Sequence, residues 1–329
     1  MILSNDTVPF FLCQYNLLDW DLINSAKIIK YDGRNNIFGA IAGNKKILVK
    51  QPIHKLSSQE EGLYHEVSFY NWFKKQGYQS NYILSCLGYE PINQVLVLPY
   101  IANASIINVQ SLTNSKIQNI CKAVFSLHHT SSVLNVPTIL MDKPNVWKFL
   151  NESDNRIDNG VKNQEWLAIM NRIEKNGTLK VVINQLTKSW SPTHLCNADI
   201  KFENFLLDGT TQQIYWIDWE RFCLADELWD IAGVLSMIFF DYLNQYKNLS
   251  TVLENAQFRN NISIIWNTTT QYIPEISKEK LLISWIVSML NKALESVQAG
   301  TMNYGVVLFI LSICEMMFLN SLKIYSLFC

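Results

Sequence analysis

One constellation in the second half of the chain limits the possible folds more than any other feature. Asp199 is followed five residues later by Asn204, which precedes the apolar run Phe205–Leu207. A second run, Ile214–Ile217, ends in Asp218, fourteen residues beyond Asn204. Phosphotransfer uses such a set, because one acid orients an acceptor hydroxyl while an amide and a second acid bind magnesium on a nucleotide. Each residue alone fits a turn, so the prediction depends on their joint spacing beside short strands.

A lysine further upstream adds to this set. Lys50 ends a predicted strand and can neutralise the α- and β-phosphates of a nucleotide. Glu66 lies on the next predicted helix, Ser58–Gln76, and is the expected partner of Lys50, with Glu60 and Glu61 as competitors. Most such lysines and glutamates are solvated surface residues. The downstream acids are therefore what favours a functional pair.

Short apolar or β-branched runs make the first hundred residues or so rich in strands. The expected strands are Ala26–Tyr31, Ile37–Ala42, Lys46–Lys50, Ser85–Tyr89 and Gln94–Pro99. Gly43-Asn44 fits a two-residue hairpin turn. Further along, the apolar residues follow a helical period. The expected helices are Ser115–His129, Trp166–Ile173, Leu179–Trp190, Trp229–Tyr242, Leu281–Gln298 and Val306–Tyr325.

These elements predict an α+β fold with two lobes. The first, residues 1–103, is a small strand-rich lobe with one helix and is expected to bind a nucleotide. The second, residues 104–329, is larger and mostly helical, and carries the catalytic segment and the acceptor site. Pro99–Ala104 is the expected hinge between them, with a ligand cleft beneath it.

Composition excludes several classes of protein. Hydrophobic residues make up 49% of the 329 residues, so the chain can bury a large core. The formal net charge is −1, without the basic excess of nucleic-acid-binding proteins, so no nucleic-acid partner is expected. The seven cysteines are odd in number and none is spaced as C-x-x-C. This pattern favours reduced thiols in the cytoplasm over a disulfide framework or a zinc ribbon.

The sequence predicts no contact with a membrane. The N-terminus lacks a basic region before its apolar residues and does not resemble a signal peptide. The most apolar stretch, Val306–Leu319, is shorter than a membrane span and contains Glu315. A buried C-terminal helix is expected there.

Together these motifs resemble the aminoglycoside-phosphotransferase and choline-kinase superfamily, whose fold is protein-kinase-like. The resemblance extends over roughly residues 26–240. The catalytic segment of that family usually reads H-G-D-x-x-x-x-N, and here it runs from Asn197-Ala198-Asp199 to Asn204. The resemblance implies a catalytic acid (Asp199), two magnesium ligands (Asn204 and Asp218), a phosphate lysine (Lys50) and its partner (Glu66). The main departure is Asn197 in place of the histidine, whose side chain supports the loop in this fold.

The resemblance assigns three further segments. Asp226 to Asp230 resembles the D-P-x-x-D-L-A motif, in which the second acid accepts backbone N–H bonds from the catalytic loop. The hinge residues that would bind adenine through backbone groups are Pro99, Tyr100 and Ile101. Lys201 matches the lysine in the D-x-K-x-x-N motif of Ser/Thr protein kinases. In those kinases this lysine reaches the γ-phosphate. A solvated loop lysine is the alternative interpretation of Lys201.

The resemblance implies a cytoplasmic phosphotransferase that uses ATP and Mg²⁺ to phosphorylate a hydroxyl of a small molecule. A Ser or Thr of a ribosomally made peptide is an alternative acceptor. A pseudokinase binding module and nucleotidyl transfer with ATP reversed are alternative functions. From Asp241 onward the sequence contains six acidic and six basic residues, so it has no acidic excess and a polycationic aminoglycoside acceptor is not favoured. Acceptor identity, the choice of ATP or GTP and the oligomeric state stay open.

Overall fold

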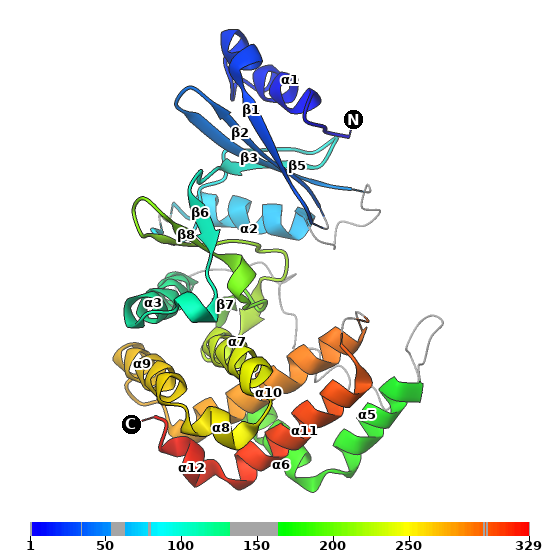
Figure 1. Ribbon diagram of the computed structural model, residues 1–329, viewed down its shortest axis with the longest axis vertical. Coiled ribbons are helices and arrows are strands. Elements are labelled where there is room, and N and C mark those ends of the chain that lie inside the picture. The colour runs from blue at the N-terminus through cyan, green and yellow to red at the C-terminus, as the bar shows by residue number, and fades with distance from the viewer. Residues whose placement is uncertain are drawn as a thin grey trace. The chain divides into compact units, whose positions relative to one another are not determined.

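The computed structural model describes residues 2–33, 35–53, 63–77, 80–131, 164–298, 300 and 302–328. The chain forms two compact units. The first unit comprises Met1–Ile107 and Glu203–Phe222, and the second unit comprises Asn108–Phe202 and Cys223–Cys329. The first contains an antiparallel sheet with two helices and the second is mostly helical (Figure 1), which confirms the predicted α+β class.

The first unit contains a five-stranded antiparallel sheet in the order β1-β2-β3-β5-β4. Its strands are β1 Lys27–Tyr31, β2 Asn35–Ala42, β3 Lys45–Pro52, β4 Gly88–Glu90 and β5 Val95–Pro99. The predicted hairpin turn joins β2 to β3, where Ala42 pairs with Lys45. Gly43 lies there at φ 57°, a left-handed conformation that glycine adopts without strain.

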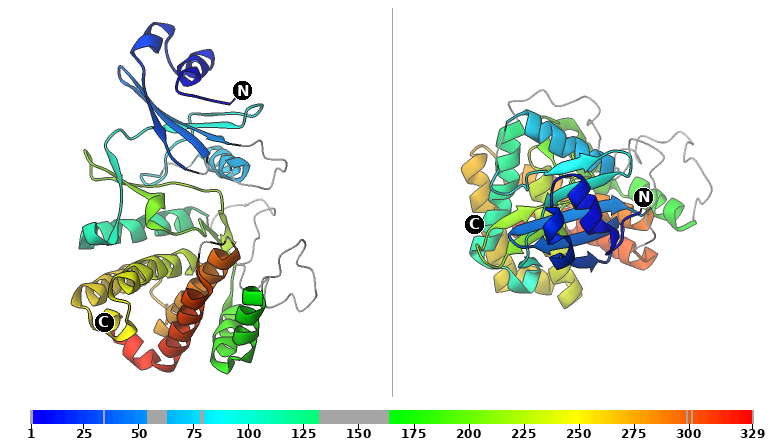
Figure 2. Two further views of the ribbon diagram at one scale, coloured as in Figure 1. Left: turned by 45° about the vertical axis from the view of Figure 1, so that its right-hand side comes forward. Right: turned by 90° about the horizontal axis from the view of Figure 1, so that it is seen from above.

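Helices cover both faces of this sheet (Figures 1 and 2). Side chains alternate between the faces of a strand. Ile47 and Val49 of β3 pack in one core cluster with Phe11 and Leu12 of α1 (Thr7–Gln14), which is followed by the 3₁₀ turn η1 (Trp20–Ser25). The opposite face of β3 carries Lys50, which contacts α2 (Leu63–Lys75). The sheet therefore separates a mainly apolar layer, which also buries the polar side chain of Gln51, from a layer that holds charge.

A second, three-stranded sheet completes the first unit. Its order is β6-β8-β9, with β6 Ala104–Ile106, β8 Phe205–Asp208 and β9 Ile214–Trp216. The two predicted strands β8 and β9 pair antiparallel, with Phe205 opposite Trp216. Trp216 also donates its N–H to the carbonyl of Tyr82 at 2.7 Å. These bonds hold the segment before Asp218 within the first unit.

Helices dominate the second unit. They are α3 Asn114–Ser131, α5 Gln164–Lys175, α6 Gly177–Ser189, α7 Trp229–Tyr246, α8 Leu249–Glu254, α9 Ala256–Tyr272, α10 Lys278–Gln298, α11 Tyr304–Leu319 and α12 Ser321–Tyr325. Two 3₁₀ turns, η2 Val109–Ser111 and η4 Phe202–Asn204, and a strand pair, β7 His194–Cys196 and β10 Cys223–Ala225, complete the assigned elements. Helix α7 is almost wholly buried and packs against α10, where the rings of Phe239 and Trp285 lie 5.7 Å apart.

One helix prediction was wrong. The expected single helix Val306–Tyr325 is two helices, α11 and α12, which are separated at Asn320. The side-chain amide of Asn320 donates to the carbonyl of Met316 at 2.8 Å, so a local side-chain bond competes with helix propagation there. None of the helices in the described ranges is long and apolar enough to cross a membrane.

Candidate active site

A buried charge cluster lies on the helix-covered face of the five-stranded sheet. The ammonium Nζ of Lys50 lies 2.6 Å from Oε2 of Glu66 and 2.9 Å from Oδ1 of Asp218. Lys50 is 8% exposed and Glu66 only 1%. Glu66 is thus the partner of Lys50 in the structure, whereas its expected competitors Glu60 and Glu61 lie outside the described residues.

Two carboxylates share this one ammonium, and the pKa values reflect it. Burial alone would lower the pKa of Lys50, but the negative charges of Glu66 and Asp218 raise it above its ordinary value. Burial raises the pKa of Glu66. The positive charge of Lys50 acts in the opposite direction, whereas the negative charge of Asp218 raises this pKa further. Lys50 therefore stays a fixed positive charge, and burial makes its partner Glu66 harder to ionise than an exposed glutamate.

Aromatic packing fixes the direction of Asp218. Its neighbour Trp219 is fully buried, and its ring stacks on Phe69 of α2 with centroids 4.0 Å apart and planes 8° apart. Asp218 itself adopts φ 65°, a left-handed conformation that is uncommon for residues other than glycine. Strained backbone of this kind persists where the surrounding packing enforces it, and it clusters at functional sites. The Trp219 anchor thus turns the Asp218 carboxylate toward Lys50.

Asn204 lies next to Asp218 in the fold. Asn204 is 2% exposed, and its backbone carbonyl accepts the N–H of Ile217, the residue before Asp218, at 2.9 Å. The two predicted magnesium ligands therefore lie beside one small sheet, Asn204 directly before β8 and Asp218 two residues after the end of β9. A carboxylate and a side-chain amide supply hard oxygen atoms, the donors that Mg²⁺ prefers, so this donor set fits the ion.

The expected hinge residues lie at the end of β5 in the same unit. The N–H of Tyr100 donates to the carbonyl of Lys46 at 3.0 Å, and the carbonyl of Ile101 accepts the N–H of Ala104 at 3.1 Å. Pro99 is the last residue of β5. The ring of Tyr100 lies so close to Gly39 that an added Cβ would stand 2.9 Å from it.

A tyrosine pair lies beside this hinge. The hydroxyl of Tyr100 lies 2.6 Å from that of Tyr31, at the end of β1. Burial, together with this hydrogen bond, raises the pKa of Tyr31 to about 12. The hydroxyl of Tyr31 therefore remains neutral at physiological pH.

The catalytic segment follows strand β7 in the second unit and is held by Asp230. The carboxylate of Asp230 accepts the N–H of Asn197 at 2.9 Å and the N–H of Ala198 at 3.0 Å. This is the structural role that the resemblance implies for Asp230. The side-chain oxygen of Asn197 in turn accepts the N–H of Asp199 at 3.1 Å. Asn197 thus supports the loop in place of the usual histidine.

Lys201 lies close to the predicted catalytic acid. Its Nζ is 2.6 Å from Oδ2 of Asp199, and the two side chains are 33% and 17% exposed. Lys201 is therefore an ion-pair partner of Asp199 in the structure, and its catalytic role stays a prediction.

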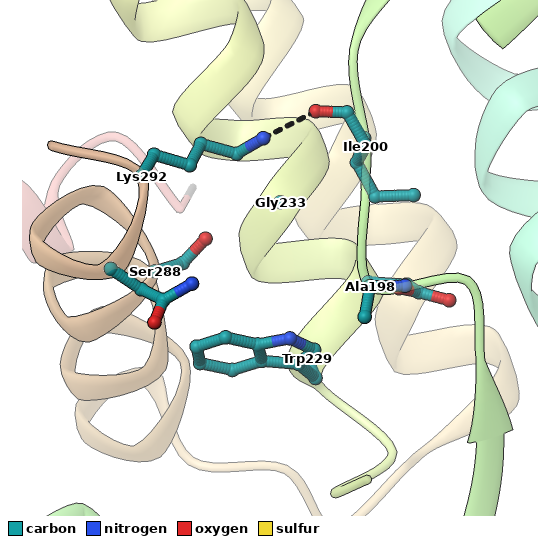
Figure 3. A pocket seen from close by; sticks show the side chains of 8 residues that line it. Ala198, Ile200, Trp229, Gly233, Ser288 and Lys292 are labelled. Carbon is teal, nitrogen blue, oxygen red and sulfur yellow. Dashed lines mark hydrogen bonds between the residues drawn. The ribbon is translucent and has the colours of Figure 1, made fainter. Parts of the chain in front are cut away.

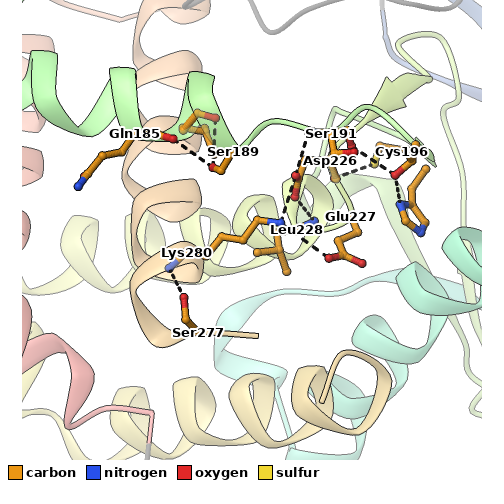
Figure 4. A network of polar contacts seen from close by, with 12 residues as sticks. Gln185, Ser189, Ser191, Cys196, Asp226, Glu227, Leu228, Ser277 and Lys280 are labelled. Atoms are coloured by element: carbon orange, nitrogen blue, oxygen red, sulfur yellow. Dashed lines mark hydrogen bonds and ion pairs between the residues drawn. The ribbon is translucent and has the colours of Figure 1, made fainter. Parts of the chain in front are cut away.

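A second acid, Asp226, braces the start of helix α7 (Figure 4). Its carboxylate accepts the N–H of Ser191 at 3.3 Å and the N–H of Leu228 at 3.1 Å, and Nζ of Lys280 lies 3.3 Å away. Lys280 belongs to α10, and sequence reasoning missed it. No local pattern identifies it, because its partner is more than fifty residues away in the chain.

The family of the chain follows from its sequence. A model described as "Phosphotransferase enzyme family" matches residues 54–248, more than half of the chain. The chain therefore belongs to that family, in agreement with the resemblance seen in its motifs. A search of curated proteins gave no match.

Solved structures of low sequence identity share the fold. A choline/ethanolamine kinase family protein from Mesorhizobium loti is 15% identical with a TM-score of 0.56, and the match covers 97% of this chain and 99% of that one. The ethanolamine kinase of Plasmodium vivax is 16% identical with a TM-score of 0.61, covering 93% and 87%. An aminoglycoside phosphotransferase in ternary complex with ADP and hygromycin B is 12% identical with a TM-score of 0.53, covering 95% and 98%.

Proposed function

We propose that this member of the phosphotransferase enzyme family transfers the γ-phosphoryl group of ATP to a hydroxyl of a small molecule, with magnesium as cofactor. The observation that carries the proposal is the buried pair of Lys50 and Glu66 beside Asp218. A lysine buried against two carboxylates is costly to maintain for stability alone. The cluster is explained if the site presents one fixed cation to a polyphosphate and one carboxylate to its metal ion.

Nucleotide binding falls to residues of the first unit. The backbone of Pro99, Tyr100 and Ile101 would bind adenine, as the resemblance implies. Lys50 would contact the α- and β-phosphates with Glu66 fixing its direction, because a paired ammonium keeps its charge and its rotamer. The solved relative that contains ADP supports the choice of an adenine nucleotide.

Magnesium would be held by Asn204 and Asp218. When bound, the ion would neutralise part of the negative charge of the phosphates. The stacked ring of Trp219 holds the backbone of Asp218, and the bond to Ile217 holds the backbone of Asn204. Both ligands would therefore be presented from fixed backbone positions.

Asp199 would orient the acceptor hydroxyl and receive its proton. The hydroxyl oxygen forms a bond to the γ-phosphorus while the bond from that phosphorus to the β-γ bridging oxygen breaks, and ADP leaves. Lys201, held 2.6 Å from Asp199, supplies positive charge where negative charge develops on the transferred group. Phosphotransfer then needs little covalent participation by the protein, because positioning and charge supply most of the catalysis.

The acceptor is proposed to be a small-molecule alcohol. Relatives of the same fold are named as choline/ethanolamine and aminoglycoside kinases, which act on small molecules. The balance of six acids and six bases from Asp241 onward does not favour a polycation. Incubation with ³²P-labelled ATP and a panel of small alcohols, together with Ser- and Thr-containing peptides, identifies the acceptor class by which product is labelled.

The decisive test measures thermal stabilisation by ATP with and without Mg²⁺. Selective binding to the native state stabilises it by about 2.7 kcal/mol at a ligand concentration one hundred times the Kd. The wild type is expected to show a shift that needs magnesium, and Asp218→Asn to lose most of it. Asp21→Asn removes the same charge from an exposed position and is the matched control. An equal shift in Asp218→Asn and the wild type, or no shift in either, would refute the proposal.

A further inference from the structure

The catalytic segment carries a backbone strain that needs an explanation. Ala198 adopts φ 61°, a conformation that glycine tolerates and a residue with a Cβ resists. The family pattern H-G-D has glycine at this position, whereas this chain has alanine. A strained residue directly before the proposed catalytic acid stays in place only if its surroundings hold it there.

We propose that Lys292 is a positioning residue that, together with Gly233, holds the segment around Asp199 in its strained conformation. The catalytic part of this inference rests on the proposed function. Lys292 lies on helix α10 and is half-buried, with its Nζ 2.5 Å from the backbone carbonyl of Ile200 (Figure 3). A hydrogen bond from an ammonium to a carbonyl is charge-assisted and stronger than a neutral one.

Gly233 fixes the side chain of the same residue. Gly233 is on α7, and a Cβ added there would lie 2.7 Å from Cγ1 and 2.8 Å from Cβ of Ile200, closer than real carbon atoms approach. The isoleucine, 2% exposed, therefore packs directly on the helix backbone. Helix α7 thus packs against the side chain of Ile200, and helix α10 binds its carbonyl through Lys292.

Asp199 lies between two restrained neighbours. On its N-terminal side, Asp230 accepts the N–H groups of Asn197 and Ala198. On its C-terminal side, Ile200 is held as described above. Because both adjoining peptides are fixed, the backbone position from which the Asp199 side chain projects is fixed as well. Lys292 acts through Ile200, and no direct contact with a substrate is required of it.

The first test measures hydrogen exchange and needs no turnover. Lys292→Met removes the donor with little change in volume, Lys292→Arg keeps a charged donor, and Lys188→Met removes an exposed lysine of α6 as the control. Amide exchange of Asp199–Lys201 is expected to rise at least tenfold in Lys292→Met, with the amides of α7 unchanged, and to stay near wild type in the other two variants. Unchanged exchange in the segment, or a uniform rise across the unit, would overturn the proposal.

The second test separates kcat from KM in the phosphotransfer assay. Lys292→Met is expected to lower kcat by about 10- to 100-fold, because misplacement of a catalytic group by about 1 Å has that effect. KM for ATP should change less than twofold, and Lys292→Arg should recover most of kcat. A wild-type kcat in Lys292→Met would overturn the positioning role. If the wild type itself shows no transfer while exchange responds as expected, the proposed function fails and the role of Lys292 in holding the segment stands.

Discussion

Replacement of Lys50 by methionine should make stability depend steeply on pH. The substitution keeps the volume but removes the ammonium that lies 2.6 Å from Glu66. Glu66 is 1% exposed and has Asp218 as its second charged neighbour in the cluster. An ionised carboxylate buried beside another acid is more costly than a protonated one, so Glu66 should take up a proton on folding.

The magnitude follows from linkage. In Lys50→Met, burial and the charge of Asp218 still raise the pKa of Glu66 in the folded protein, and the ammonium that opposed this is gone, while in the unfolded chain the pKa is about 4.3. A group whose pKa is higher in the folded than in the unfolded protein stabilises the fold fully at a pH below its pKa in the unfolded chain. This contribution to the free energy of unfolding is lost as the pH rises. Relative to the wild type, Lys50→Met therefore loses stability as the pH rises from 5 to 7, by up to about 1.4 kcal/mol for each pH unit over which Glu66 stays protonated in the folded protein.

Urea denaturation at pH 5, 6 and 7 measures this difference between Lys50→Met and the wild type. The double variant Lys50→Met with Glu66→Gln is the control, since it has no carboxyl group to protonate at that position. The double variant should recover much of the loss at pH 7 and remove the extra pH dependence. A loss in Lys50→Met that is the same at pH 5 and pH 7 would show that Glu66 is not the titrating group.

Three further substitutions test the rest of the site. Trp219→Ala deletes a fully buried ring stacked at 4.0 Å and should cost roughly 3–5 kcal/mol in urea denaturation. Gly233→Ala forces a Cβ to within 2.7 Å of Ile200 and should cost about 1–3 kcal/mol, measured in the same way. Asn197→Ala removes the acceptor of a catalytic-segment N–H and should lower kcat about tenfold, since such a bond contributes roughly 1 kcal/mol or more; unchanged kcat would contradict it.

The strands of the first unit were predictable because their signals are local. Alternating apolar residues and the turn at Gly43-Asn44 occur within a few residues of each other, and β1, β2, β3 and β5 match the expected runs closely. The same holds for Asn204, which directly precedes β8, and Asp218, which follows β9. The roles proposed for those residues, and the lobe boundary expected at residue 103, stay predictions.

Elements without a local signal were missed. Helix α1 is eight residues long, too short for its apolar residues to reveal a helical period. Helix α9 is rich in asparagine and threonine, which are weak helix formers, and it buries Phe258, Ile262 and Ile265 against its neighbours. Lys292 could not be found at all, because its partner Ile200 is some ninety residues earlier in the chain. Tertiary packing determines each of these features.

The departures of the catalytic segment from the family pattern bear on whether the chain is an enzyme or a binding module. Loss of the histidine would argue for a pseudokinase if the loop collapsed without it. Instead, the amide oxygen of Asn197 accepts the N–H of Asp199, and Asp230 holds both residues before the acid. The alanine at position 198 is strained, yet the segment is held on both sides of Asp199. A chain that no longer needed to orient this acid would have no functional requirement for that strain, so the arrangement favours an enzyme.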